Sequence, residues 1–466
     1  MLTLEQQKVV DTVCSTTDDR IIAVNSIAGS GKTSTGAAVI DTYKPTNGFY
    51  TAFNKAIVQD STKRFGDKIS CKTIHALAYK FVKPSREIED LNYLTIKENI
   101  PYEDKALVIT ILDDFFRSNS LDIEDFTKTQ TSRENIQDLV FKYANLMLDG
   151  KISPTFNYLL KCLHIMLADK EIEIDFDLLI LDECQDTTAV TLEIFKLINA
   201  KRKVIFGDKF QNIYSFMNTV NAFEELDDLH ILKLTKSFRC NLTIANTIEE
   251  YGKNYLEPSF IYTGNEFLDT TNDTTAFITR TNANLINRMY ELLFKGFTFT
   301  LTRNINEIFA LPIALLNASS GRPVFDKRYK YLQKEFLNYS NVKRDFSSFF
   351  QYITMITNDI VLENTCKLLT NFATRRINLY DIKQQVQNMK TNPKIILTTA
   401  HAFKGLEADS VYIEDDLNNS VNRTIKKIKS GATKDALAKE DVEDLNTYYV
   451  ALSRARYNLS NVNYER

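Results

Sequence analysis

The stretch IIAVNSIAGSGKT (residues 21–33) joins an apolar, β-branched run to a glycine-rich turn, and a segment with helical periodicity follows it. Gly29 and Gly31 permit a turn that points backbone N–H groups at a phosphate. The start of the following helix adds the positive end of its dipole. This strand–loop–helix order predicts a phosphate-binding loop at the end of a buried strand in an α/β fold.

The residue types in this loop indicate that its ligand is ATP with Mg²⁺. Lys32 is placed to reach the β- and γ-phosphates, and the Thr33 hydroxyl to hold the metal ion. The pattern departs from its usual form at Ser26, where a glycine is more common. The residues of the loop predicted to bind the nucleotide are Ala28, Gly29, Ser30, Gly31, Lys32, Thr33 and Ser34.

A second motif, FDLLILDECQD (residues 176–186), ends an apolar run with two adjacent carboxylates. Carboxylates at the end of a buried strand are costly unless a charged group lies beside them. A metal ion held by Asp182, with Glu183 polarising the attacking water, supplies that reason. Together with Lys32, this motif predicts hydrolysis of a nucleoside triphosphate.

Several further short apolar runs predict strands buried in parallel sheets. Apolar residues point to both faces of such runs, and segments with helical periodicity lie between many of them. This alternation predicts doubly wound α/β layers. The predicted strands are Ile21–Ile27, Phe49–Phe53, Phe176–Leu181, Lys203–Phe206, Thr275–Thr279, Lys394–Thr399 and Ser410–Ile413.

The strand signals fall into two groups, so we expect two α/β domains, each with a mostly helical insertion. The first domain is predicted at residues 1–83 and 176–233, with its insertion at 84–175. The second is predicted at 234–300 and 391–466, with its insertion at 301–390. The segment Asp415–Asp441 is rich in Lys, Asn and Asp, and we expect a solvated excursion there.

The composition of the 466 residues is that of a soluble globular protein, with 44% hydrophobic and 25% charged residues. A net charge of −3 argues against a basic protein that coats nucleic acid, as chromatin proteins do. It is compatible with a narrow basic groove. Apolar runs long enough for a membrane span are absent from the sequence, as is the apolar core of a signal peptide. Six cysteines without a CxxC pair, and four histidines, argue against zinc and favour a reducing cytoplasm.

The order of the motifs resembles that of the UvrD/Rep/PcrA helicases of superfamily 1. The sequences of the motifs are similar to those in the helicase core of F-box DNA helicases. The resemblance covers both ends of the chain and leaves out mainly the two insertions. It rests on GSGKT and DECQD, and on GDKFQNIYSF (207–216), LTKSFR (234–239), TTAHAFKGLE (398–407) and TYYVALSRA (447–455). It implies two RecA-like domains with ATP in the cleft between them.

The resemblance also implies roles for residues outside the phosphate loop. Gln6 would read the adenine edge, Phe238 would stack under adenine, and Gln211 would sense the γ-phosphate. Arginines delivered to a γ-phosphate accelerate its transfer about 10³–10⁵-fold. The residues implied at the nucleotide are Gln6, Gln211, Phe238, Arg239, Gly405, Glu407 and the arginine finger Arg454.

A further set of residues is implied to hold DNA. Aromatic rings stack on any base without reading its sequence, which suits Tyr214 and Phe216. Phe216 stands where other members carry tryptophan, and Ala402-Phe403 where a Ser-Ala pair is commoner. The residues implied to bind DNA are Phe53, Asn54, Thr73, His75, Tyr214, Phe216, Arg280, Thr399 and His401.

The function implied is an ATP-dependent DNA helicase that moves 3′→5′ on single-stranded DNA and unwinds duplex. The predicted direction rests on the sequence IYSF shortly after Gln211, which resembles the branch of the family that moves 3′→5′. Three alternatives stay open: a translocase that strips proteins such as a recombinase from DNA, an RNA helicase, and an ATP-gated binding module. Expected partners are single-stranded and duplex DNA and replication or recombination proteins, for a monomer in a bacterial or infected host cytoplasm. Abundant Asn, Ile, Lys and Tyr, and the lack of Trp, favour an AT-rich, viral genome.

Overall fold

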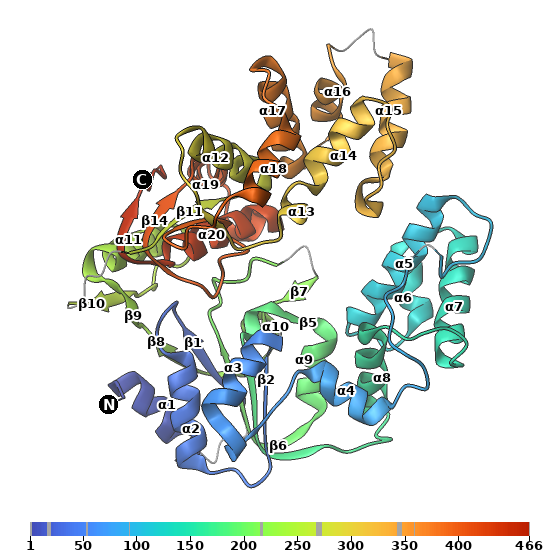
Figure 1. Ribbon diagram of the computed structural model, residues 1–466. Helices are drawn as coiled ribbons and strands as arrows, with labels where there is room; N and C mark the ends of the chain where they lie inside the picture. Colours follow the sequence, from blue (N-terminus) through green and yellow to red (C-terminus); the bar gives the residue numbers. More distant parts are fainter. Residues whose placement is uncertain are drawn as a thin grey trace. The chain divides into compact units, whose positions relative to one another are not determined.

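A computed structural model describes residues 2–15, 20–52, 55–92, 94–214, 218–266, 273–342, 347–357 and 359–465 of the chain. The chain divides into two compact units, Met1–Lys236 and Ser237–Arg466. Each unit combines a parallel sheet with helices, which confirms the predicted α/β class (Figure 1). Within the described ranges, no helix is both long enough and apolar enough to cross a bilayer.

The sheet of unit 1 has the strand order β3-β2-β4-β6-β1-β8, and every neighbouring pair is parallel. Its strands are β1 (Ile22–Ser26), β2 (Gly48–Ala52), β3 (Ser70–Cys71), β4 (Asp175–Asp182), β6 (Asn199–Gly207) and β8 (His230–Leu234). In β4, Leu178 and Ile180 belong to one hydrophobic core and Leu179 and Leu181 to another. Both faces of the sheet are therefore buried, as the continuous apolar runs predict.

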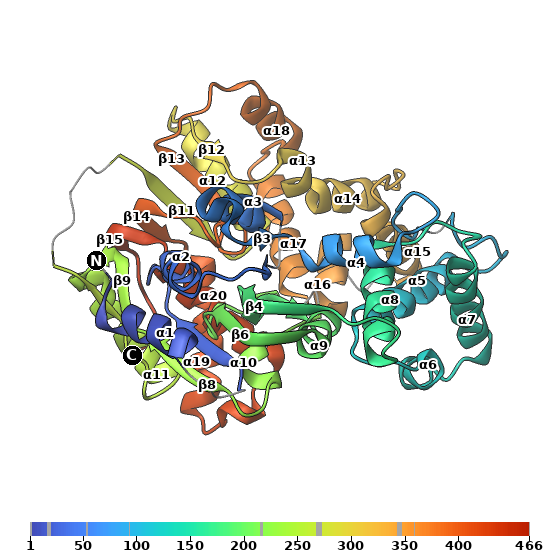
Figure 2. The ribbon, with the colours of Figure 1, turned by 90° about the horizontal axis from the view of Figure 1, so that it is seen from below.

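Two groups of helices cover these faces (Figure 2). One core is closed by α1 (Leu4–Ser15), α2 (Lys32–Tyr43) and α3 (Lys55–Phe65). The other is closed by α4 (Ile74–Val82), α8 (Phe156–Ala168), α9 (Ala189–Leu197) and α10 (Ala222–Glu225). Short elements complete the unit: η1 (Gly66–Lys68), η2 (Cys184–Asp186), and the antiparallel pair β5 (Thr187–Thr188) and β7 (Thr219–Val220).

Within its described residues, the range predicted as the first insertion contains helices and no strand until β4 begins at its last residue, Asp175. The helices are α5 (Tyr102–Arg117), α6 (Ile123–Gln130), α7 (Glu134–Leu148) and α8. Val108, Leu112, Ile136 and Val140 belong to a core of their own, while Leu163 of α8 belongs to the core under α4. Helix α8 thus joins the insertion to the α/β layers of unit 1.

The main sheet of unit 2 is also parallel, in the order β12-β13-β11-β14-β15. Its strands are β11 (Thr275–Thr279), β12 (Thr300–Leu301), β13 (Ile395–Thr399), β14 (Ala408–Ile413) and β15 (Ala455–Ser460). A separate two-stranded sheet pairs β9 (Lys236–Asn241) with β10 (Thr263–Asn265). The three strands predicted in this half of the chain are confirmed as β11, β13 and β14.

The helices of unit 2 fall into those beside the sheet and those in the range of the second predicted insertion. The first group is α11 (Leu242–Tyr255), α12 (Asn282–Phe294), α19 (Asp415–Lys429), η6 (Lys434–Ala436) and α20 (Lys439–Leu452). The second is α13 (Ile305–Ile308), α14 (Ala310–Ser319), η4 (Lys327–Tyr329), α15 (Tyr331–Val342), α16 (Phe349–Ile356), α17 (Ile360–Thr374) and α18 (Leu379–Asn388). One core joins α14, α17 and α18 to α12.

The prediction of a solvated excursion at Asp415–Asp441 is wrong for residues 415–429, whereas most of the residues described from 430 to 441 are exposed. Helix α19 occupies Asp415–Lys429, and Leu417, Val421 and Ile425 are buried on one of its faces. These three residues recur every four positions, which is the spacing of one face of a helix. The many polar residues between them concealed this pattern.

Candidate active site

The phosphate loop lies between the end of β1 and the start of α2. Gly29 has φ +76° and Gly31 φ +80°, a left-handed conformation that favours glycine. Ile27 N donates to Leu234 O of β8 at 3.1 Å, which fixes the start of the loop. Gln6 is buried, and its Nε2 donates to Ser30 O at 3.3 Å. The structure therefore brings Gln6 against the phosphate loop, 24 residues away in the chain.

Lys32 forms an ion pair with Glu183 across the end of the sheet. Its Nζ lies 2.6 Å from Glu183 Oε1, and both side chains are mostly buried. Burial alone would lower the pKa of Lys32, but the carboxylates of Glu183, Asp182 and Asp208 outweigh it and raise this pKa. The ammonium group therefore stays protonated at neutral pH.

Asp182 is buried at the carboxyl end of β4. Its Oδ2 accepts a hydrogen bond from the Tyr50 hydroxyl, and its Oδ1 accepts from Glu183 N at 2.8 Å. Burial raises the pKa of Asp182, the Lys32 charge opposes this rise, and the Glu183 charge adds to it. Glu183 itself has φ +51°, a conformation that is strained for a residue with a side chain.

The charges at this site fit a divalent metal ion. The single ammonium of Lys32 is surrounded by the carboxylates of Asp182, Glu183 and Asp208, which leaves an excess of negative charge. Oxygen ligands of this kind suit Mg²⁺. Thr33 lies in the first turn of α2, next to Lys32, with its side chain partly buried. Asp182 and Thr33 are the residues that would hold the ion.

Gln185 connects the carboxylates after β4 with those after β6. Its Nε2 donates to Glu183 Oε2 at 2.7 Å, and its Oε1 accepts from Asp208 N at 3.2 Å. Asp208 Oδ2 in turn accepts from Gln211 Nε2 at 2.7 Å. A continuous polar path therefore runs from Lys32 through Glu183, Gln185 and Asp208 to Gln211.

Gln185 and Asp208 were not among the predicted site residues, although both lie in motifs that the sequence shows. A signal for each was available. Gln185 follows Glu183 by two positions, and Asp208 comes directly after the apolar run that ends β6. Polar residues at the carboxyl ends of neighbouring parallel strands meet at one edge of the sheet, and β4 and β6 are neighbours.

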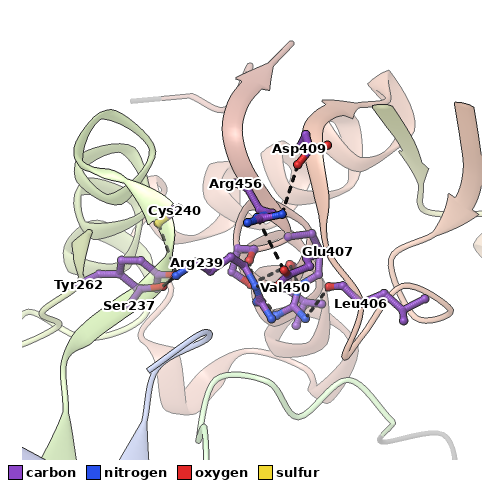
Figure 3. A network of polar contacts seen from close by, with 11 residues as sticks. Ser237, Arg239, Cys240, Tyr262, Leu406, Glu407, Asp409, Val450 and Arg456 are labelled. Carbon is purple, nitrogen blue, oxygen red and sulfur yellow. Dashed lines mark hydrogen bonds and ion pairs between the residues drawn. The ribbon is translucent and has the colours of Figure 1, made fainter. Parts of the chain in front are cut away.

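Unit 2 holds a second network around Arg239 and Glu407 (Figure 3). Arg239 Nε donates to Glu407 Oε2 at 2.7 Å, and its Nη1 donates to Ser453 O at 3.0 Å. Glu407 follows Gly405, which is exposed and has φ +84°. Phe238 precedes Arg239 on β9 and is 43% exposed. The structure thus brings Arg239 and Glu407 together across 168 residues of chain.

Arg454, the predicted arginine finger, is only 2% exposed. Its Nε donates to Val450 O at 2.9 Å, its Nη2 to Ser453 Oγ at 2.8 Å and its Nη1 to Leu406 O at 3.4 Å. Arg239 and Arg454 therefore both donate to Ser453. A reach to a γ-phosphate requires Arg454 to leave these acceptors.

Two of the DNA-binding residues predicted in unit 1, Thr73 and His75, have structural roles in the fold. Thr73 caps α4, since its hydroxyl accepts from Ala76 N at 3.2 Å. His75 packs edge-on against Phe156 of the first insertion, and burial lowers its pKa. Tyr214 is partly exposed after β6. Phe53, Asn54 and Phe216 lie outside the described residues.

Two of the DNA-binding residues predicted in unit 2, Arg280 and His401, lie beside two acidic residues of α20. Arg280 Nε lies 3.0 Å from Asp444 Oδ1, and its Nη2 lies 3.8 Å from Glu443 Oε1. His401 Nε2 lies 3.4 Å from the same Glu443 oxygen. Thr399, at the end of β13, is buried, and its hydroxyl accepts from Ala402 N at 3.3 Å. Sequence reasoning missed the acidic pair, because it lies in the polar first part of α20, before the motif TYYVALSRA begins at Thr447.

Comparison with known proteins finds a family match, and the similar curated proteins include two F-box DNA helicases. Residues 6–217 match the AAA domain family. The chain is 24% identical over 465 residues to F-box DNA helicase 1 of Gallus gallus, covering 89% of this chain and 44% of the relative. It is 24% identical over 519 residues to F-box DNA helicase protein 1 of Schizosaccharomyces pombe, covering 98% of this chain and 57% of the relative. The chain spans about half the length of these relatives.

Proposed function

Because the chain has a superfamily 1 helicase core, we propose that it is an ATP-driven DNA helicase that moves 3′→5′ on single-stranded DNA. The observation that carries the proposal is the polar path from Lys32 through Glu183 and Gln185 to Asp208 and Gln211. This path joins the phosphate loop to the carboxyl ends of two neighbouring strands. It gives the site a cation for phosphate, carboxylates for a metal ion and water, and an amide near them.

The residues of unit 1 divide the work of hydrolysis among themselves. Lys32 pairs with Glu183 and would turn to the β- and γ-phosphates when ATP binds. Glu183, released from this pair, would polarise the attacking water, while Gln185 holds its other oxygen. Mg²⁺ held by Thr33 and Asp182 would neutralise charge that develops on the phosphates.

We propose that Arg239 and Arg454 of unit 2 complete the nucleotide site. Arginines that stabilise the transferring phosphoryl group make hydrolysis depend on the arrangement of the domains. Both arginines already lie at Ser453, in one network. Movement along DNA would follow from the way in which ATP changes the contacts of these two residues.

The first test is the ATPase rate with and without single-stranded DNA, for the wild type and Lys32→Ala. We expect strong stimulation by DNA in the wild type and loss of turnover in the variant. Lys68→Ala is the matched control, because Lys68 makes only an exposed pair with Asp41 in the same unit. Turnover that survives Lys32→Ala would refute the proposed site.

Substrates separate the proposed function from its alternatives. Unwinding of 3′-tailed but not 5′-tailed duplex would support the proposed direction, and the reverse would overturn it. ATPase activity stimulated by RNA alone would favour an RNA helicase. Movement on single-stranded DNA that displaces a bound recombinase without opening duplex would favour the stripping translocase.

A further inference from the structure

A third arginine, Arg456, lies in the network around Glu407 (Figure 3). It belongs to β15, which pairs with β14 through Ala408 opposite Ala455 and Ser410 opposite Asn458. Between these pairs, Asp409 faces two residues of β15, Arg456 and Tyr457. A bulge of this kind redirects side chains, often beside active sites. None of the sequence motifs assigned a role to Arg456.

Glu407 is held unequally by its two arginines. Arg239 Nε lies 2.7 Å from Glu407 Oε2, whereas Arg456 Nε lies 3.7 Å from Glu407 Oε1. The first distance is a hydrogen-bonded ion pair, and the second is an ion pair beyond hydrogen-bond length. The Glu407 side chain is 45% exposed and that of Arg456 38% exposed. Both side chains therefore have room to move toward each other.

Asp409 keeps Arg456 close to Glu407. Arg456 Nη1 donates to Asp409 Oδ1 at 3.4 Å. The other oxygen of Asp409 accepts from Asp273 N at 3.1 Å and from Thr274 N and Oγ1, each at 3.0 Å. Burial alone would raise the pKa of Asp409, but these hydrogen bonds and Arg456 outweigh it and lower this pKa. Asp409 is thus an ionised and fixed anchor.

The proposed function creates an electrostatic problem at Glu407. When Arg239 turns to a γ-phosphate, Glu407 loses its close partner while a highly charged anion arrives nearby. Like charges at short range repel, most of all where water is partly excluded. A cation that stays paired with Glu407 would remove this penalty. Arg456 already lies beside Glu407 Oε1, the oxygen opposite the one that Arg239 contacts.

We propose that Arg456 is a positioning residue, which replaces Arg239 as the close ion-pair partner of Glu407 when Arg239 moves to the γ-phosphate. This inference rests on the proposed function. An approach of about 1 Å would bring Arg456 Nε from 3.7 Å to hydrogen-bond distance of Glu407 Oε1. The exchange depends on the γ-phosphate, so it distinguishes ATP from ADP.

The test compares the dissociation constants of AMP-PNP and ADP, measured with Mg²⁺ by calorimetry on the full chain. We expect Arg456→Ala to weaken AMP-PNP binding about fivefold, the effect of one partly exposed ion pair. ADP binding should change little, because ADP leaves Arg239 on Glu407. Arg456→Lys keeps the charge and should restore most of the affinity for AMP-PNP.

A double-mutant cycle with Glu407→Gln separates positioning from a general structural role. Without the Glu407 charge, Arg456→Ala should no longer alter the AMP-PNP to ADP ratio. An unchanged ratio in Arg456→Ala, or an equal effect in both backgrounds, would overturn the inference and leave the proposed function standing. A wild-type chain that binds neither nucleotide would instead refute the proposed function, and the inference with it.

Discussion

Gly207, the last residue of β6, is a position where the addition of one methyl group should disturb the active site. A Cβ atom there would lie 2.6 Å from Gln185 Oε1, 2.7 Å from Cys184 Sγ and 3.0 Å from Phe223 Cε2. The φ of Gly207 is not in the left-handed region, so the penalty of Gly207→Ala comes from these contacts and not from the backbone. The substitution would press directly on the polar path of the active site.

The size of the effect follows from the displacement of Gln185. Its Oε1 has to retreat by about 0.6 Å to reach a tolerable carbon–oxygen contact, which stretches the 3.2 Å hydrogen bond from Asp208 N beyond its range. A buried polar group left unpaired costs about 1–3 kcal/mol, and overpacking costs about the same again. We therefore expect Gly207→Ala to lower the free energy of unfolding of unit 1 by about 2–6 kcal/mol.

Activity should fall more steeply than stability, because Gln185 also holds Glu183 at 2.7 Å. A misplaced catalytic group costs on the order of 10²-fold in rate. The assay is DNA-stimulated ATPase activity together with urea denaturation of the same preparations. Gly36→Ala is the matched control, since its Cβ in helix α2 would meet only Phe65 Cζ at 4.0 Å, and alanine favours a helix. Wild-type turnover by folded Gly207→Ala would refute the role given to Gln185.

Three further variants test other parts of the structure. Tyr50→Phe removes the hydrogen bond to Asp182 and should cost about 1.5–3 kcal/mol of unfolding free energy in urea, so unchanged stability would contradict this contact. Glu443→Gln frees Arg280 and His401 of a negative charge and should tighten oligonucleotide binding in fluorescence anisotropy, most at low salt; weaker binding would count against their contact with DNA. Burial and the charge of Lys161 lower the pKa of His164 to about 4, against about 6.5 in the unfolded chain. Between these two pKa values, His164 is protonated in the unfolded chain and neutral in the folded one. The free energy of unfolding should therefore fall by on the order of 3 kcal/mol from pH 7 to below pH 4. His164→Leu should remove this part of the pH dependence, and an unchanged acid transition would show that His164 is not its cause.

Strands buried on both faces were predictable, whereas strands at the edges were not. The central strands β1 and β4 contain the apolar runs Ile22–Val24 and Leu178–Leu181, whose side chains enter the cores on both faces of the sheet. The outer strands β8 and β15 expose alternate residues, and their sequences HILKL and ARYNLS contain charged and amide side chains. A half-exposed strand at the edge of a sheet leaves only a weak alternation in the sequence.

The phosphate loop and the paired carboxylates could be predicted from the sequence alone, because their chemistry needs neighbouring residues in one short stretch. Lys32 follows its glycines directly, and Asp182 and Glu183 are adjacent. The order of the motifs further implied which residues belong to the nucleotide and which to DNA. These predictions required no knowledge of which strands lie side by side.

The ion-pair partners of charged residues in these motifs are known from the tertiary structure and not from the sequence. Lys32 meets Glu183 across 151 residues, Arg239 meets Glu407 across 168, and Arg280 meets Asp444 across 164. The Lys32 pair depends on the order of the parallel strands, which brings the ends of distant segments to one edge of a sheet. The other two pairs depend on where β9 and α20 pack in unit 2. The sequence around a charged residue does not indicate which distant residue will pair with it. The ion pairs around the site therefore follow from the fold alone.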